Sequence, residues 1–329
     1  MRMNRRTITI TCMFLTLAIL WAVPASAART LKYGHNTKEN QPTGKAALLF
    51  ADLVQKKTNG DIVVQVFPNN QLGNNKQMAD NLRMGALDLS TMGLAALAYL
   101  NDAYMMMQVP YVFRSQEHIH KVVNGEIGQQ LKADFAQKNG IVLLAQDWDR
   151  MPRHIAGRKP IRTLEDFKGY KVRAGVLPPI VGFKAIGASP VDIPLNEMYL
   201  ALQQGVVDGA ELPTDYIYEY SIFEVSKYFN KTSHTFGTQF LGINKRVWDS
   251  LKPEHQKAIQ EAADEAGRFN NKLDAELQDD YLEKLKKGGM EFVDTDVESF
   301  RKATYERINE IPKNWEGGAK LFERIQATH

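Results

Sequence analysis

The spacing of apolar residues predicts alternating strands and helices over residues 28–150. Residues 62–67 are apolar at nearly every position, as in a strand that is covered on both faces. Helical spacing of i, i+3, i+4 and i+7 precedes this strand at Ala46, Leu49, Phe50 and Leu53. With further strands expected at 31–34 and 87–92 and a second helix ending at Gly85, the order is β-α-β-α-β. This order favours a parallel sheet flanked by helices.

A second alternation follows a polar run at 147–154, which we interpret as the first crossing into a second lobe. It comprises a strand at 170–173, a helix at 196–204 and a strand that ends at Gly209. A helical pattern then runs from Pro253 to Gly288 and would approach about 50 Å, long enough to lie across both lobes. The sequence therefore predicts an α/β protein with two lobes, each a mostly parallel sheet flanked by helices. The expected first lobe is 28–150 plus about 238–277, and the second is 151–237 plus about 278–329.

The amino terminus has the pattern of a secretory signal peptide. Arg2, Arg5 and Arg6 precede an apolar run over 8–23, and Ala25-Ser26-Ala27 forms a small-residue exit. The run is shorter than the roughly 20 apolar residues that span a membrane, so a transmembrane helix is the weaker interpretation. We expect cleavage after Ala27.

Cleavage there removes three of the 41 basic residues and none of the 38 acidic ones, which leaves a formal net charge of zero. A neutral surface argues against nucleic acid or an anionic membrane as a partner. The single cysteine, Cys12, falls in the signal segment, so the remaining chain has no disulfide, thiolate nucleophile or zinc-thiolate site. Ordinary hydrophobic cores must then hold the chain together.

The sequence contains none of the motifs that would indicate an enzyme. It lacks G-x-S-x-G, a Walker loop, a dinucleotide glycine fingerprint and H-E-x-x-H, so neither catalysis nor a cofactor is expected. His118 and His120 would diverge on a helix, which favours solvated surface histidines over a metal pair. We interpret the methionine-rich run 104–107 as core under a loop rather than as an adaptable pocket.

Two arginines are candidates for binding an anion. Arg173 is the last residue of the expected strand 170–173, at the carboxyl end that would face the ligand side of an open α/β sheet, and Arg153 lies at the entry to the second lobe. A guanidinium offers a planar fork of donors that matches a carboxylate. Position alone leaves a surface ion pair equally open.

Several segments resemble the solute-binding subunits of TRAP (tripartite ATP-independent periplasmic) transporters of the dicarboxylate type. The resemblance covers the whole mature chain. The matching segments are Phe67-Pro68-Asn69-Asn70-Gln71-Leu72-Gly73, Val109-Pro110-Tyr111-Val112-Phe113, Leu164-Glu165-Asp166-Phe167-Lys168-Gly169-Tyr170-Lys171-Val172-Arg173, Gly187-Ala188-Ser189-Pro190 and the run from Tyr199 to Gly209.

This resemblance implies a two-lobed periplasmic binding protein whose cleft shuts on an organic acid. It implies that Arg173 forms a salt bridge with the ligand's carboxylate and that Arg153 makes a second contact. The implied partners are one small and one large integral membrane protein, and we expect a monomer in the periplasm. A sensor subunit of a signalling receptor and, less readily, a periplasmic enzyme are the alternatives. Neighbouring genes for membrane subunits or for a histidine kinase would separate transport from sensing.

Departures from the family pattern bear on the ligand. Members that bind sialic acid have polar groups where this chain has Gly93 and Ala96, an aromatic residue near Leu195 and an asparagine at Leu212. These positions lead us to expect an acid that is smaller or more apolar than sialic acid. By rough alignment, other pocket candidates are His35, Trp148, Asp215 and His234.

Overall fold

The computed structural model describes residues 28–310, 315 and 318–329. Within them, nine strands form one continuous sheet in the order β2-β1-β3-β8-β4-β7-β5-β6, with β9 beside β8. The strands are β1 (Arg29–Gly34), β2 (Ile62–Phe67), β3 (Leu89–Gly93), β4 (Ile141–Gly157), β5 (Lys171–Ala174), β6 (Ser189–Asp192), β7 (Gly209–Pro213), β8 (Tyr228–Asn244) and β9 (Glu291–Val293).

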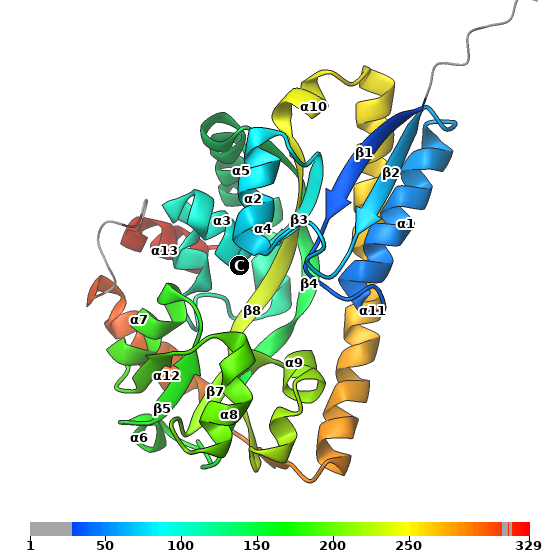
Figure 1. Cartoon of the computed structure of the whole chain (residues 1–329). Helices are drawn as coiled ribbons and strands as arrows, with labels where there is room; N and C mark the ends of the chain where they lie inside the picture. Colours follow the sequence, from blue (N-terminus) through cyan, green and yellow to red (C-terminus); the bar gives the residue numbers. More distant parts are fainter. Residues whose placement is uncertain (1–27, 311–314, 316–317) are drawn as a thin grey trace, which may run out of the picture.

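Helices cover both faces of this sheet (Figure 1). They are α1 (Pro42–Lys57), α2 (Asn75–Met84), α3 (Leu94–Leu100), α4 (Gln116–Asn124), α5 (Glu126–Asn139), α6 (Leu164–Phe167), α7 (Leu177–Ala185), α8 (Met198–Gln203), α9 (Thr214–Glu219), α10 (Lys245–Asp249), α11 (Pro253–Lys287), α12 (Val297–Glu306) and α13 (Gly318–Gln326), with short 3-10 turns η1 (Asp102–Tyr104) and η2 (Met106–Gln108) before α4. No described helix is both long enough and apolar enough to cross a bilayer.

Two parallel groups of strands are joined by two long antiparallel ones. β1 pairs in parallel with β2 and β3, and β5 pairs in parallel with β6 and β7. β4 and β8 are 17 residues each, or about 56 Å, and they pair with each other along their length. The two lobes are therefore halves of one continuous sheet, and each half has the parallel group of strands that the sequence predicted.

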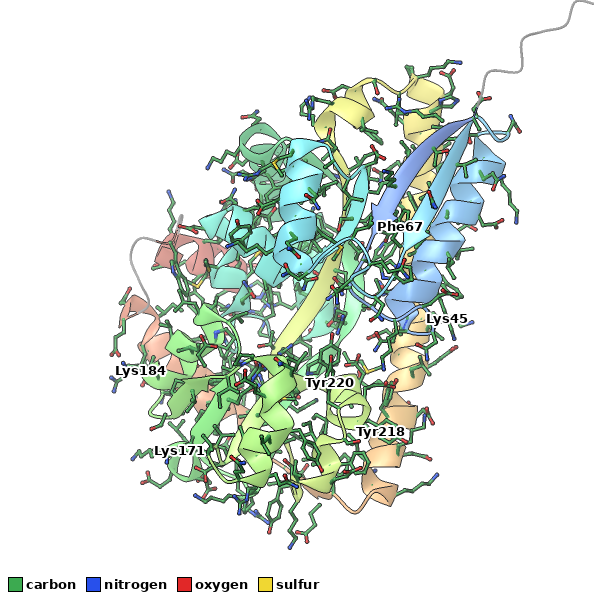
Figure 2. All side chains as sticks on the ribbon, in the orientation of Figure 1. Lys45, Phe67, Lys171, Lys184, Tyr218 and Tyr220 are labelled. Atoms are coloured by element: carbon green, nitrogen blue, oxygen red, sulfur yellow. The ribbon has the colours of Figure 1, made fainter. Side chains whose placement is uncertain are left out.

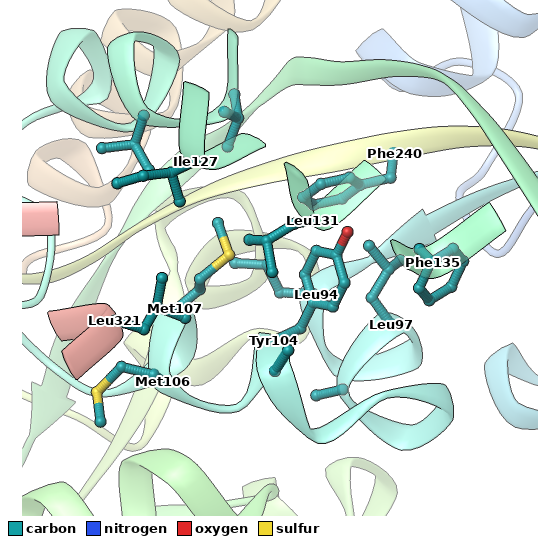
Figure 3. Packing of buried hydrophobic residues seen from close by; sticks show 14 of the residues in the cluster. Leu94, Leu97, Tyr104, Met106, Met107, Ile127, Leu131, Phe135, Phe240 and Leu321 are labelled. Carbon is teal, nitrogen blue, oxygen red and sulfur yellow. The ribbon is translucent and has the colours of Figure 1, made fainter. Parts of the chain in front are cut away.

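The half that contains β1, β2 and β3 has a hydrophobic core on each face of the sheet. On one face, Phe50 of α1 packs with Ile259 and Ala262 of α11. On the other face, Tyr104, Met106 and Met107 are buried with residues of α3 and α5 (Figure 3). The methionine-rich run is thus core, as the sequence predicted.

The other half has two smaller cores and shares α11 with the first. One core gathers α8, α9 and β7, and it includes Leu285 near the end of α11. The other gathers α6, α7 and α12 around Phe167, Phe183 and Phe300. α11 is 35 residues long, or about 52 Å, and it runs along both halves (Figure 1), as its sequence pattern predicted.

The carboxyl-terminal segment packs differently from the expectation. It was placed in the second lobe from about 278 onward, but Leu321, Phe322 and Ile325 of α13 are buried in the same core as Leu131 and Phe135. The apolar face of α13 finds its partners in the first half, so the chain returns there at its end. Residues 1–27, which carry the expected signal peptide and cleavage site, lie outside the described residues.

Candidate ligand-binding site

A cavity of about 270 Å³ lies between the two halves, where β4 and β8 pass from one to the other. Its charged lining residues are Arg150, Arg153, Arg173 and Glu211. Its polar lining includes Asn36, Asn75, Gln108, Thr235, Thr238 and Gln239. Its apolar lining includes Leu94, Met151, Val176, Pro179, Leu195 and Leu212.

An outer hollow of about 450 Å³ adjoins the cavity and shares Asn36, Asn75, Leu195 and Tyr216 with it. Tyr220 also lines this hollow, and Figure 2 shows it where the green elements face the blue ones. The cavity therefore has a polar approach from the side of α9.

Arg173 reaches the cavity from the end of β5. Its Nε donates a hydrogen bond of 2.8 Å to the carbonyl of Ile193, which fixes the guanidinium while its other edge faces the cavity. A Cβ on Gly175 would lie 2.4 Å from an Nη atom of Arg173, so a side chain there would displace the guanidinium from this position. Among the residues that the structure describes, no carboxylate lies within 4 Å of Arg173, although only 5% of the residue is exposed. Burial lowers the pKa of Arg173, and Glu211 partly offsets this.

Arg153, which is partly exposed, forms an ion pair across β4 and β7 with the buried Glu211. The Nε of Arg153 lies 2.5 Å from Oε2 of Glu211, and Nε2 of His234 lies 3.5 Å from the same oxygen. Burial alone would raise the pKa of Glu211, but Arg153 and His234 lower it to about 2. Glu211 therefore stays ionised, and Arg153 has only part of its guanidinium free for a ligand.

Arg150 enters the same cavity although it is three residues from Arg153. In a regular strand these two side chains would face opposite sides of the sheet. β4 has a register shift against β8 between Arg150 and Arg153, and such bulges redirect side chains. Both arginines therefore line one cavity.

Arg150 is held by aromatic and acidic neighbours. It lies 3.8 Å from Asp215 and 5.4 Å from the ring centre of Tyr216. Burial opposes its charge, but Tyr216, Asp215 and Asp274 outweigh this and raise the pKa of Arg150. Arg150 thus has its counter-charges within the protein.

Several buried polar atoms of the wall have no hydrogen-bond partner in the described structure. They are the hydroxyl oxygens of Thr235 and Thr238 and Oε1 of Gln239, all from β8. Gln239 is 3% exposed, and its Oε1 lies 3.8 Å from where a Cβ would stand on Gly93, another lining residue. These atoms are a set of unused hydrogen-bonding groups in the cavity that Arg173 also lines.

Four residues expected at the site from the sequence do line the cavity, namely Arg153, Arg173, Leu195 and Leu212. Four others lie behind its wall. Trp148 and His35 are fully buried in the first half, where Trp148 packs in the core with α11 and His35 bonds to Thr37 at 2.8 Å. His234 contacts the cavity only through Glu211, and Asp215 only through Arg150. His234 and Asp215 each adjoin a lining residue in sequence, Thr235 and Tyr216, but their own side chains are buried behind the wall.

The expected apolar wall is only partly present. Gly93, Leu195 and Leu212 line the cavity, whereas Ala96 is buried in the core under α3. Sequence reasoning missed Arg150, Glu211, Gln108 and the polar residues of β8. One signal was available for Glu211, because an acid within the otherwise uncharged strand 209–213 must be paired when buried.

The interpretation of His118 as a surface residue is wrong. His118 is 4% exposed, and its Nε2 lies 3.0 Å from the carbonyl of Ile325, because the end of the chain covers it. His120 is partly exposed and lies 2.5 Å from Oδ1 of Asp149. In the described part of the chain, no three histidine, cysteine or acidic side chains gather so as to hold a metal ion.

Comparison with known proteins places this geometry in a family. The family model described as bacterial extracellular solute-binding protein, family 7, matches residues 33–314. The 2,3-diketo-L-gulonate-binding periplasmic protein of Escherichia coli is 32% identical over 98% of this chain and 99% of its own length.

Solved structures agree with the sequence match. A TRAP periplasmic solute-binding protein from Ochrobactrum anthropi has a TM-score of 0.86 at 30% identity, covering 92% of this chain and 94% of its own. One from Polaromonas, bound to D-erythronate, has a TM-score of 0.80 at 32% identity, covering 91% and 99%. The family consists of solute-binding proteins and not of enzymes. The chain thus belongs to family 7 of the bacterial extracellular solute-binding proteins, the binding proteins of TRAP transporters.

Proposed function

We propose that this TRAP solute-binding protein holds a small organic acid in the cavity, with the ligand's carboxylate on Arg173 and a second contact from Arg153. After export and cleavage behind Ala27, it works in the periplasm as a monomer and hands the acid to one small and one large membrane subunit. The 2,3-diketo-L-gulonate and D-erythronate named for two relatives are both carboxylic acids, which supports an acid as the ligand here.

The observation that carries this proposal is the buried, unpaired guanidinium of Arg173. A buried charge without a partner is costly, so the site is complete only when an anion arrives. The hydrogen bond from Nε to Ile193 leaves the Nη atoms of Arg173 for that anion.

We also propose a division into lobes that modifies the one expected from the sequence. The first lobe comprises 28–150, about 238–277 and the carboxyl-terminal helix α13, and the second comprises 151–237 and the segment from about 278 through α12. The shared core of α13 and α5 supports the change. Closing the lobes would shield Arg153 and Arg173 from water.

Substitution of Arg173 tests the proposed role. A thermal-shift screen of keto, hydroxy, aromatic and sugar acids first identifies a ligand, because binding to the native state raises its stability. Removing one partner of a buried charge pair costs about 3 to 5 kcal/mol, so Arg173→Ala should weaken binding by about two to three and a half orders of magnitude. Arg173→Lys should recover only part of this, because lysine keeps the charge and loses the planar fork.

Lys171→Ala is the matched control for calorimetry. Lys171 lies on the same strand but is exposed at the edge of the molecule (Figure 2), so its removal should leave the affinity unchanged. Wild-type affinity in both Arg173 variants would show that Arg173 is structural and that the proposed site is wrong.

A further inference from the structure

The charges around the cavity leave one guanidinium unmatched. Arg153 is paired with Glu211, and Arg150 lies 3.8 Å from Asp215. Arg173 alone of the three lining arginines has no carboxylate within 4 Å in the described part of the chain. One ligand carboxylate therefore balances the site, whereas a second one would enter a buried space without a cation to pair with.

The outer hollow adds no buried cation, because both of its lysines are exposed to solvent. Of its two lysines, Lys38 is paired with Glu219 at 3.0 Å. The ammonium of Lys76 is exposed and lies 4.5 Å from the ring centre of Tyr99. Glu219 itself adds negative charge at this side. The electrostatics of the cleft therefore favour a ligand with one carboxylate.

The unpaired polar atoms of β8 set a second requirement. Thr235, Thr238 and Gln239 each bring a buried oxygen that lacks a partner within the described structure. Buried polar groups in folded proteins nearly always find a hydrogen bond, and leaving one unmade costs stability. Because all three residues line the cavity, their missing partners belong to whatever fills it.

Hydroxyl groups fit this requirement better than a second carboxylate or an alkyl chain does. Oε1 of Gln239 needs a donor, and threonine hydroxyls can both donate and accept. A ligand carboxylate only accepts and an alkyl chain does neither, whereas a hydroxyl does both. The apolar side chains of Val176, Leu195 and Leu212 can cover the C–H groups between hydroxyls.

We propose that the cavity takes a hydroxylated monocarboxylate, a short sugar acid of the aldonate kind, in preference to a dicarboxylate or an unsubstituted fatty acid. This rests on the proposed function, because it assumes that Arg173 holds the single carboxylate. The proposal agrees with the expectation of a ligand smaller than sialic acid, because the cavity is about 270 Å³. It replaces the expectation of an apolar ligand.

Two matched sets of acids test the proposal by calorimetry on the mature protein. The six-carbon set is D-gluconate, hexanoate and D-glucarate, and the four-carbon set is L-threonate, butyrate and L-tartrate. In each set the members share a chain length and differ in hydroxyl groups or in a second carboxylate. At least one aldonate should bind tenfold or more tighter than both of its counterparts.

Each alternative result contradicts a defined part of the proposal. Equal binding of the dicarboxylate overturns the argument from charge, and equal binding of the fatty acid overturns the argument from β8. Failure of both aldonates to bind at millimolar concentration overturns the ligand class. If an aldonate binds and Arg173→Ala does not weaken it, the proposed function fails instead, so the two failures are distinguishable.

Substitutions in β8 test whether its unpaired polar residues cause the preference for an aldonate. Thr238→Val and Gln239→Met keep the side-chain size and remove the unpaired atom. Each should weaken the aldonate by about three- to tenfold, leave the fatty acid unchanged and not lower the melting temperature of the free protein, because no internal hydrogen bond is lost.

Thr91→Val is the matched control. Thr91 is buried on the neighbouring strand β3, bonds to the hydroxyl of Tyr33 and is not among the cavity-lining residues. It should lower the melting temperature and leave the affinity unchanged. If Thr238→Val and Gln239→Met behaved like this control, or weakened both acids equally, their role would be structural and the inference would be wrong.

Discussion

Glu211 determines how Arg153 can act on a ligand. Its carboxylate takes the Nε edge of Arg153 at 2.5 Å and is 1% exposed, so the pair is fixed inside the wall. With the pKa of Glu211 lowered to about 2, this arrangement persists through the neutral range. Arg153 is therefore a weaker anion contact than Arg173, which has no carboxylate within 4 Å in the described part of the chain.

Asp274 of α11 gives a prediction about pH. Burial raises the pKa of Asp274 to about 7, and Asp215 and Asp149 add to this while Arg150 opposes it. Between about pH 4 and 7 the folded protein thus holds a proton that the unfolded chain releases, so this residue's contribution to stability falls as pH rises. Asp274→Asn should be more stable than the wild type, and its advantage should be larger at pH 8 than at pH 5 by about 2 kcal/mol.

Urea denaturation of the wild type and Asp274→Asn at the two pH values measures this difference. Asp279→Asn, on an exposed position of the same helix, is the control and should show no such gain. Equal stability differences at pH 5 and pH 8 would mean that Asp274 does not titrate in this range.

The residues of the site divide into those that the sequence could predict and those that it could not. Arg173 was predictable because it lies at the carboxyl end of a strand, where ligands bind, and the family pattern supported it. Arg150 was not, because its direction depends on a bulge in β4 that no residue pattern announced. The polar residues of β8 resembled an ordinary solvated stretch, since nothing in the sequence says that they face a closed cavity.

At the scale of elements, β4 and β8 were difficult to predict for the same reason as the polar site residues that they carry. Of β4, only 141–145 has the short apolar run that predicts a strand, because the rest alternates poorly and carries charge. These strands cross between the lobes, where one side faces the cleft, so polar residues replace apolar ones. By contrast, α11 and β2 have both their faces and their ends set by local patterns, and their predicted ranges match the structure closely.

The placement of α13 gives a prediction at this scale. Phe322 is buried in the core of the first half and lies 4.9 Å from the ring centre of Tyr305. Phe322→Ala should lower the free energy of unfolding by about 3 kcal/mol, because it removes apolar contacts and leaves a cavity. Lys320→Ala, exposed on the same helix, should have little effect. Equal denaturation midpoints for the two variants would show that α13 does not belong to this core.

At the scale of the whole molecule, the lobes are connected by three crossing elements and by a contact at the mouth of the cleft. β4, β8 and α11 run through both halves and act as the shared backbone (Figure 1). Across the mouth, Lys38, which follows β1, forms an ion pair of 3.0 Å with Glu219 of α9. Glu219 also accepts a hydrogen bond of 3.0 Å from Tyr281 of α11, which holds it in place.

This ion pair should favour the closed arrangement in which a ligand is enclosed. A ligand shifts an equilibrium between open and closed lobes only as far as it binds the closed form better, so a bond made on closure adds to the apparent affinity. The side chain of Lys38 is 56% exposed, and exposed ion pairs contribute about 0.2 to 1 kcal/mol. Lys38→Ala should therefore weaken the binding of the best ligand from the screen by about two- to fivefold.

Small-angle scattering should show a decrease in the radius of gyration on ligand addition in both proteins, and this decrease should be complete only at a higher ligand concentration in the variant. Lys56→Ala, which breaks the pair with Asp52 within α1, is the matched control and should leave the titration unchanged. Coincident titrations of Lys38→Ala and the wild type would show that the pair does not stabilise closure, and an unchanged radius of gyration in the wild type would contradict closure itself.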